Sequence, residues 1–185
     1  MNAQLVRTFR VHDTRVSALC VVSEGERFVS GASDGSLRIG SLLHDDALFT
    51  TQMASGVTTM TPFQDSYFVV TGYEDGSIIL LNAETGEAVR TIRGHEDSVT
   101  SLVVSEDGKT VLSSSEDGSI RVWDSVSGRK LHHFGQDNET TRSMTLLPNS
   151  TAFITSETSI DGQNTLRVRT LEKANEDARD FVTLN

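Results

Sequence analysis

Residues 116–120 read EDGSI, and nearly the same pentapeptide occurs twice before, as SDGSL at 33–37 and EDGSI at 74–78. The aspartates of the three copies, Asp34, Asp75 and Asp117, recur at an almost constant interval. Each copy stands between two short apolar segments. An Asp-Gly pair in that position predicts a β-hairpin, because glycine adopts a positive φ without steric cost. The chain is therefore predicted to repeat a β-strand unit of about 41 residues.

A valine precedes each of these aspartates at the same offset, at Val16, Val57 and Val99, and each valine begins a short strand-like segment. Another turn and another such segment follow the hairpin. Each unit thus has four antiparallel strands, which we name a, b, c and d in chain order. The predicted units span residues 10–52, 53–93, 94–134 and 135–185; the last is degenerate, with a d strand at 180–184, and residues 4–9 are predicted to form a leading d-type strand.

Composition and charge limit the partners. The chain has 185 residues and a formal net charge of −10, with only three lysines. Binding to nucleic acid needs clustered Lys and Arg, so we expect no nucleic-acid partner. No stretch approaches the length of a membrane span and the N-terminus lacks the apolar core of a signal peptide, so we expect no membrane insertion and an intracellular, cytoplasmic protein. The single cysteine, Cys20, lies in an apolar run and is predicted to be buried.

Residues 94–124 also carry a family resemblance. Gly94-His95 stands at the start of this segment and Trp123-Asp124 at its end, with a serine-rich strand and Asp117 between them. The segment resembles a WD repeat of the β-propeller family. The resemblance implies a hydrogen-bonded set in which the side chains of His95, Ser113, Asp117 and Trp123 hold the unit together. Buried polar groups need such mutual partners, since an unsatisfied one costs about 1–3 kcal/mol.

The other units keep parts of this set. The first has His12, Ser30 and Asp34 at the same offsets, with Gly40 at the tryptophan position. The second has Thr71 and Asp75, with Met53 and Leu81 at the histidine and tryptophan positions. No set can be aligned in the fourth unit.

The implied fold is all-β: a β-propeller of four-stranded antiparallel blades, about four in number. Propellers have four to eight blades, and WD propellers commonly have seven. We therefore expect an incomplete propeller, whose missing blades come from a longer chain or from self-association.

The resemblance also implies a function as a protein–protein interaction scaffold or adaptor. In WD-repeat proteins partner contacts often come from two positions after the histidine and one before the turn aspartate. Carried over by offset, the candidate partner-binding rim consists of Arg15, Ser17, Ser33, Gly56, Thr58, Glu74, Ser98, Thr100 and Glu116. Glu74, Glu116 and nearby Asp97 make this rim acidic, which favours a basic or polar segment of a partner protein.

Catalytic and metal-binding patterns are sparse, and we expect no enzyme activity, cofactor or metal. His12-Asp13, His44-Asp45-Asp46 and His132-His133 are weak metal candidates, because neighbours on a strand point to opposite faces. Ser113-Ser114-Ser115 lacks the elbow of a serine nucleophile. An enzymatic or small-ligand-binding propeller remains the alternative. A ubiquitin-ligase substrate receptor is a further alternative, although Val126 stands where its signature has a basic residue.

Overall fold

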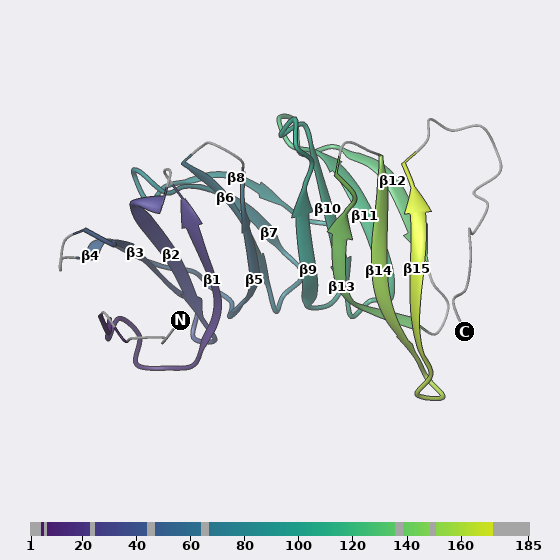
Figure 1. Cartoon of the computed structure of the whole chain (residues 1–185), viewed down its shortest axis with the longest axis horizontal. Helices are drawn as coiled ribbons and strands as arrows, with labels where there is room; N and C mark the ends of the chain where they lie inside the picture. The colour runs from purple at the N-terminus through teal and green to yellow at the C-terminus, as the bar shows by residue number, and fades with distance from the viewer. Residues whose placement is uncertain are drawn as a thin grey trace.

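The structure is a computed structural model that describes residues 5, 7–22, 25–43, 47–63, 67–135, 139–148 and 151–171. The regular elements of these residues are all β-strands, which form three four-stranded sheets and one three-stranded sheet with antiparallel pairing throughout. The sheets stand side by side in an open arc (Figure 1). The all-β, unclosed propeller architecture predicted from the sequence is confirmed. The described residues contain no helix long and apolar enough to cross a membrane.

Each sheet is one blade, and its strands follow chain order. Blade 1 contains β1 (Val16–Val22), β2 (Arg27–Ala32), β3 (Ser36–Ser41) and β4 (Ala47–Gln52). Blade 2 contains β5 (Val57–Pro62), β6 (Phe68–Tyr73), β7 (Ile78–Asn82) and β8 (Ala88–Ile92). Blade 3 contains β9 (Val99–Val104), β10 (Thr110–Ser115), β11 (Ser119–Asp124) and β12 (Lys130–Gly135). Blade 4 contains β13 (Glu139–Leu146), β14 (Ala152–Ser159) and β15 (Asn164–Thr170).

The repeated Asp-Gly-Ser turns join strands b and c of the first three blades. In each turn the aspartate carboxylate accepts a hydrogen bond from the backbone N–H of the serine two residues later, at 2.9 to 3.0 Å. The central glycine needs its positive φ, which is 83° at Gly35 and 77° at Gly76. A side chain at either glycine would also strike a backbone carbonyl of the following loop at 2.6 Å. Local turn chemistry and close blade contact together explain the pentapeptide.

The core lies between consecutive blades as three layers of apolar side chains. Val29 and Leu37 of blade 1 pack against Val69 and Tyr73 of blade 2 in the first layer. The a strands form the inner ends of these layers, with β1 beside β5, β5 beside β9 and β9 beside β13. Stability therefore depends on each blade being covered by its neighbour, as in other repeat architectures.

Of the two segments predicted as d strands at the chain ends, one is not a strand in the structure and the other lies outside the described residues. Residues 5 and 7–9 lie outside any strand, so the leading d-type strand predicted over residues 4–9 is wrong for the described residues. A d strand needs a neighbouring c strand for its backbone hydrogen bonds, and this segment has none; instead the Phe9 ring packs on Phe28 at 5.1 Å. The d strand predicted at 180–184 lies outside the described residues.

Cys20 is buried in the first layer, as expected for a free cysteine in an apolar run. Burial raises the pKa of its thiol to about 12. The thiolate is therefore disfavoured, and the side chain acts as a small apolar group.

Candidate functional site

Blade 3 brings together the four side chains that the sequence singled out. The Trp123 Nε1–H donates to Ser113 Oγ at 2.8 Å, and Ser113 Oγ lies 2.7 Å from His95 Nε2. His95 Nδ1 lies 2.9 Å from Asp117 Oδ2. A carboxylate only accepts, so Nδ1 carries the histidine proton and Nε2 accepts from the serine. The result is a continuous chain of donors and acceptors from strand c through strand b and the preceding loop to the b–c turn.

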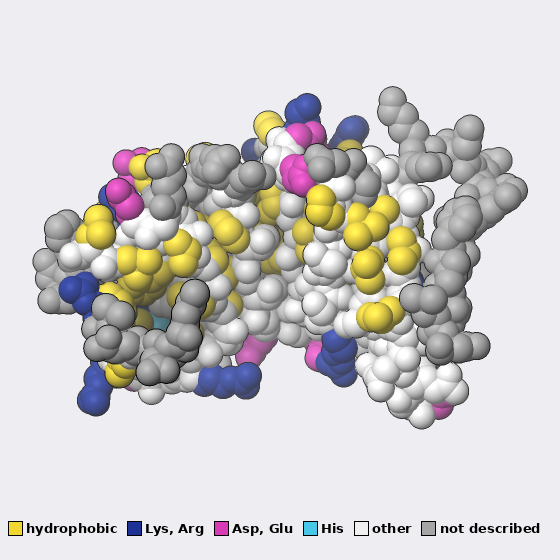
Figure 2. Space-filling model, in the orientation of Figure 1, with side chains coloured by type: hydrophobic (Ala, Val, Ile, Leu, Met, Phe, Trp, Pro, Cys, Tyr) yellow, Lys and Arg dark blue, Asp and Glu magenta, His cyan; other side chains and the backbone are white. Residues whose placement is uncertain are grey.

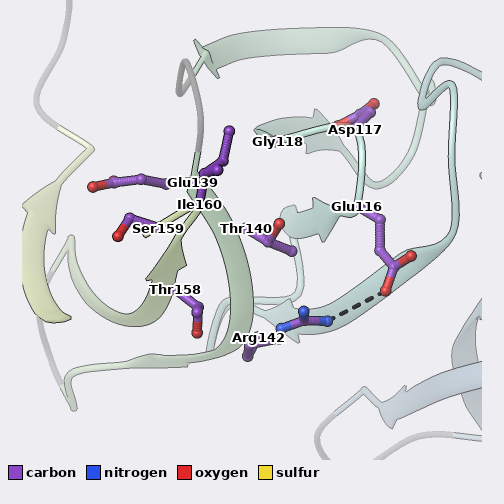
Figure 3. Close-up of a pocket in the computed structure, with 9 residues that line it drawn as sticks. All are labelled: Glu116, Asp117, Gly118, Glu139, Thr140, Arg142, Thr158, Ser159 and Ile160. Carbon is purple, nitrogen blue, oxygen red and sulfur yellow. Dashed lines mark hydrogen bonds and ion pairs between the residues drawn. The ribbon is translucent and has the colours of Figure 1, made fainter. Parts of the chain in front are cut away.

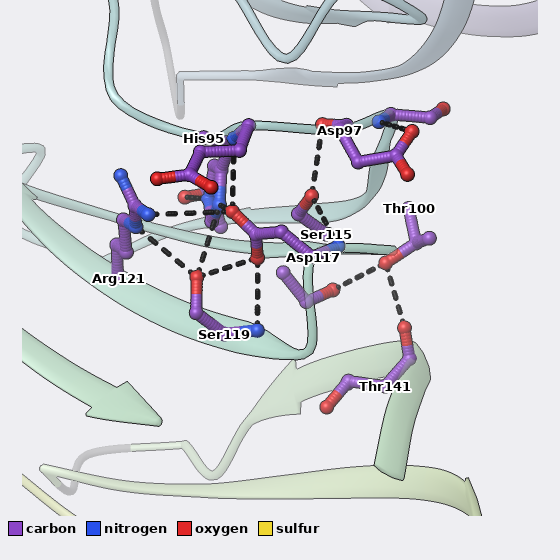
Figure 4. A network of polar contacts seen from close by, with 12 residues as sticks. His95, Asp97, Thr100, Ser115, Asp117, Ser119, Arg121 and Thr141 are labelled. Carbon is purple, nitrogen blue, oxygen red and sulfur yellow. Dashed lines mark hydrogen bonds and ion pairs between the residues drawn. The ribbon is translucent and has the colours of Figure 1, made fainter. Parts of the chain in front are cut away.

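Asp117 is the most heavily bonded member of this chain (Figure 4). Besides the His95 ring, it accepts the Glu96 backbone N–H at 3.0 Å and the Ser119 hydroxyl at 2.6 Å. The Arg121 guanidinium lies 3.3 Å away. Burial alone would raise the pKa of Asp117, but these hydrogen bonds hold it well below its usual range. Asp117 therefore stays ionised and fastens the loop before strand a to the b–c turn.

The His95 ring is neutral in this arrangement. Burial lowers its pKa, and the hydrogen bond to Asp117 opposes that effect only in part. A neutral imidazole with its proton on Nδ1 fits these contacts, because Nε2 then accepts the Ser113 hydroxyl proton while Ser113 Oγ accepts the indole N–H. The set thus bonds internally, from strand c to the b–c turn.

Blade 1 has a related set that differs from that of blade 3 at the histidine Nδ1 partner and at the tryptophan position. His12 Nε2 lies 2.7 Å from Ser30 Oγ, but its Nδ1 lies 2.7 Å from Ser36 Oγ rather than against Asp34. Asp34 joins the set through the Ser36 backbone N–H. At Gly40, where tryptophan stands in blade 3, the Phe28 ring fills the space so closely that a Cβ would collide with it.

Blade 2 has no histidine and uses a tyrosine. Thr71 Oγ1 lies 2.9 Å from the hydroxyl of Tyr73, and both residues are fully buried. Burial raises the pKa of Tyr73 to about 12. Asp75 keeps only its turn role, accepting the Ser77 backbone N–H and hydroxyl. The two predicted residues thus have different side-chain partners, Tyr73 for Thr71 and Ser77 for Asp75.

Blade 4 has an ionic cluster in this place, which the sequence analysis missed. Arg169 stands across from Phe153 as Trp123 stands across from Val111, and it donates to Thr155 Oγ1 as the indole donates to Ser113. The buried Glu157 carboxylate accepts from Arg169 at 2.5 Å and from Arg167 at 2.6 Å. Arg167 also pairs with Glu139 and lowers the pKa of that carboxyl.

The rim prediction separates into two groups of residues. The first group comprises three hydroxyl residues, one at the same place in each of the first three a strands: Ser17, Thr58 and Thr100. The Ser17 hydroxyl donates to Val57 O, the Thr58 hydroxyl to Val99 O at 2.6 Å, and the Thr100 hydroxyl to Thr141 O at 2.6 Å. Each bond joins one blade to the next. We therefore assign these three residues to blade packing and call their bonds the hydroxyl staples.

The second group reaches solvent and consists of Arg15, Ser33, Glu74, Ser98 and Glu116. Its residues are brought together in pairs by backbone hydrogen bonds, from Ser33 N to Arg15 O and from Glu116 N to Ser98 O. In blade 2 the Glu74 backbone N–H bonds to Gly56 O, and a side chain at Gly56 would lie 2.8 Å from the Glu74 carboxyl carbon. Glu74 and Glu116 are exposed, as is Asp97. We call Glu74, Asp97 and Glu116 the acidic rim.

A pocket of about 410 Å³ adjoins this rim between blades 3 and 4 (Figure 3). It lies between the b–c turn of blade 3 and the start of β13 with the β14–β15 hairpin. Three carboxylates line it, those of Glu116, Asp117 and Glu139. Arg142 also lines it and pairs with Glu116 at 3.3 Å, with both side chains about half exposed. The pocket therefore presents three carboxylates and a half-exposed ion pair between Arg142 and Glu116.

The candidate metal sites find no support in the contacts. Among the residues that the structure describes, no three His, Cys, Asp or Glu side chains are grouped as a metal ion would require. His132 and His133 are exposed neighbours on β12, and His12 is held by two serines. His44-Asp45-Asp46 lies outside the described residues.

Comparisons with known proteins agree with this geometry. The family model for the WD domain, G-beta repeat, matches residues 3–39 and 86–124. Among solved structures, a computationally designed protein, Ika4, is similar over 90% of this chain and 98% of its own, with 27% identity and a TM-score of 0.73. U3-55K is similar over 89% of this chain and 51% of its own, with 22% identity and a TM-score of 0.80. The chain thus spans about half the length of U3-55K.

A comparison with curated protein sequences finds no match. The first match includes β1, β2 and most of β3 of blade 1, and the second includes β8 of blade 2 and β9 to β11 of blade 3. Blades 1 and 3 are the blades that carry the histidine and serine of the set. The solved structures extend the likeness to the fold of nearly the whole chain. The family-model matches and the hydrogen-bonded set show WD repeats in blades 1 and 3, and the solved structures show a propeller-type fold over nearly the whole chain.

Proposed function

We propose that this chain is a non-enzymatic protein-interaction scaffold whose acidic rim binds a basic or polar segment of a partner protein. WD repeats are typically protein-binding modules, which supports the general role. An intracellular, cytoplasmic location is part of the same proposal.

One observation carries the proposal: some residues of the predicted rim bond to the next blade, whereas others are exposed to solvent. The hydroxyl staples bond one blade to the next, whereas Glu74 and Glu116 are exposed at the b–c turns, with Glu116 in a half-exposed ion pair with Arg142. The turns are held rigid by their own backbone and aspartate hydrogen bonds. Carboxylates carried on such turns, in a chain of net charge −10, attract cationic segments and raise the rate of their association.

Peptide binding tests this proposal. The probes are fluorescein-labelled dodecapeptides of alternating Arg-Ser and of alternating Glu-Ser, measured by fluorescence polarisation at low and at high salt. We expect the chain to bind the Arg-Ser peptide, and we expect Glu74→Lys/Glu116→Lys to weaken that binding about tenfold, as the loss of two exposed charge contacts at low salt suggests.

The matched control is Glu84→Lys/Glu87→Lys, which makes the same charge change in the exposed c–d turn at the opposite end of blade 2. This control should change the affinity less than about twofold, since its charges lie far from the rim. Equal losses in both variants, or no binding of the Arg-Ser peptide by the unmodified chain, would count against the acidic rim. A turnover screen with hydrolase substrates, for which we expect no activity, separates the scaffold from the enzymatic alternative.

A further inference from the structure

The two end blades expose side chains whose counterparts between blades are buried or partly buried. Each a strand carries an apolar residue that faces the preceding blade. This residue is 6% exposed at Leu102 of blade 3 and 7% at Met144 of blade 4, and is partly buried at Met60 of blade 2, but is 64% exposed at Leu19 of blade 1. The valine that begins strand a behaves in the same way, with Val57 and Val99 buried and Val16 half exposed. Blade 1 therefore has an uncovered face of the kind that packs on another blade.

The opposite end has the complementary face. Position by position, Leu166 of blade 4 matches Ile78 and Ile120, which face the following blade in blades 2 and 3. Both isoleucines are fully buried, whereas Leu166 is 55% exposed. Ile154 and Val168 continue this strip as half-buried residues. A terminal repeat that is not covered normally has a polar outer face, and blade 4 keeps an apolar one.

Both uncovered faces lie on the same side of the molecule. In Figure 1 the sheets of blades 1 and 4 lie toward the viewer, with much of blades 2 and 3 behind them. The same view shows hydrophobic side chains over β1 at one end and over β14 and β15 at the other (Figure 2). A single partner can therefore cover both faces at once.

We propose that this partner is a second copy of the chain, and that two copies close into an eight-bladed ring. A two-fold axis places blade 1 of each copy on blade 4 of the other, so one chain supplies both halves of both contacts. Eight blades lie within the range of closed propellers. Closure removes all four uncovered faces of the two copies together.

The contact repeats the packing already present between the blades of one chain. Val57 packs over Gly31 and Val99 over Gly72, so closely that a Cβ on either glycine would lie 2.6 or 2.7 Å from the valine. At the open ends, blade 1 presents Val16 and blade 4 presents Ser156, a small residue at the position of those glycines. Ser156 carries a Cβ, as Ser114 of blade 3 does at the same position, so Val16 of one copy docks beside Ser156 of the other in the manner of the contact between blades 3 and 4 rather than of the two glycine contacts.

Light scattering on the purified chain tests the proposal. We expect a mass of twice 20.2 kDa. Leu19→Asp and Leu166→Asp each place a charge in the contact and should halve the mass, with a β-sheet circular dichroism spectrum showing that the blades remain folded. Val126→Asp is the control, because Val126 is 75% exposed in the c–d turn of blade 3 and outside the contact. A monomeric unmodified chain overturns the proposal.

Cysteine cross-linking gives a second measurement that does not depend on the aspartate variants folding. Val16→Cys/Ser156→Cys should form a covalent species of two copies under mild oxidation, and either single variant should not. Species of one copy only would show that the two positions do not meet. A ladder of three, four and more copies would show open chains instead of a closed ring, and would equally overturn the proposal.

Discussion

Ser113→Ala tests the hydrogen-bonded set of blade 3 most cleanly, because it removes one atom at the centre of the set. Ser113 is fully buried, and its Oγ bonds to both Trp123 Nε1 and His95 Nε2. Its loss leaves a buried donor and a buried acceptor without that partner. At about 1–3 kcal/mol for each unsatisfied group, the free energy of unfolding should fall by about 3 kcal/mol. At about 2–4 °C per kcal/mol for a chain of this size, the melting temperature should fall by about 6–12 °C.

Fluorescence of Trp123 provides the assay. It is the only tryptophan in the chain and is 3% exposed, so its emission reports directly on this part of the core. Ser127→Ala is the control, since the Ser127 hydroxyl bonds to Asp124 in an exposed turn, where water can replace it, and its loss should change stability by less than about 1 kcal/mol. Equal unfolding midpoints for Ser113→Ala and Ser127→Ala would refute the assignment of Ser113 as the centre of the set.

The remaining contacts give three further predictions. Thr58→Val and Thr100→Val each remove a hydroxyl staple and should lower stability in urea denaturation by about 1 kcal/mol, while Thr91→Val on an exposed strand position should not. Lowering the pH from about 7.5 to 5.5 should lower the melting temperature, because burial puts the pKa of His95 and His12 below the unfolded value of 6.5. Protonation then favours the unfolded chain, and the stabilisation present above pH 6.5 is lost as the pH falls. His95→Gln should make the melting temperature depend less on pH, and an unchanged or rising melting temperature of the unmodified chain would contradict the prediction. Arg169→Met should cost about 3 kcal/mol in the same urea assay, because the buried Glu157 carboxylate loses a cation; a loss no larger than that of exposed Arg129→Met would contradict the ionic cluster.

The parts of the fold that could be predicted from sequence are those with local causes. The Asp-Gly-Ser turns need only residues close together in the chain, and the three hairpins predicted from them are present between β2 and β3, β6 and β7, and β10 and β11. The set of blade 3 could be identified because all four of its side chains are present at the spacing of the WD repeat. The acidic rim follows from the same turns, because each b–c turn exposes the residue before its aspartate.

The parts that could not be predicted depend on which strands meet. Arg169 and Thr155 form the cluster of blade 4 across two strands, and no motif indicates an ion pair in place of tryptophan and histidine. A signal was present in the alternation of Arg167 with Arg169 and of Thr155 with Glu157, which puts all four side chains on one face. The hydroxyl staples also had a signal, since each follows the valine that begins strand a. The partner of each hydroxyl, however, belongs to the next blade.

The central claim is that four blades fill one structural position with four different sets of side chains, and that each set holds its blade. Hydrogen exchange of the full chain, read by mass spectrometry, tests this most directly. We predict slow exchange in the b and c strands of all four blades and fast exchange in the turns, in a pattern that recurs from blade to blade. If β14 and β15 exchange as fast as the turns while β10 and β11 are protected, the ionic cluster does not replace the set of blade 3 and the claim fails.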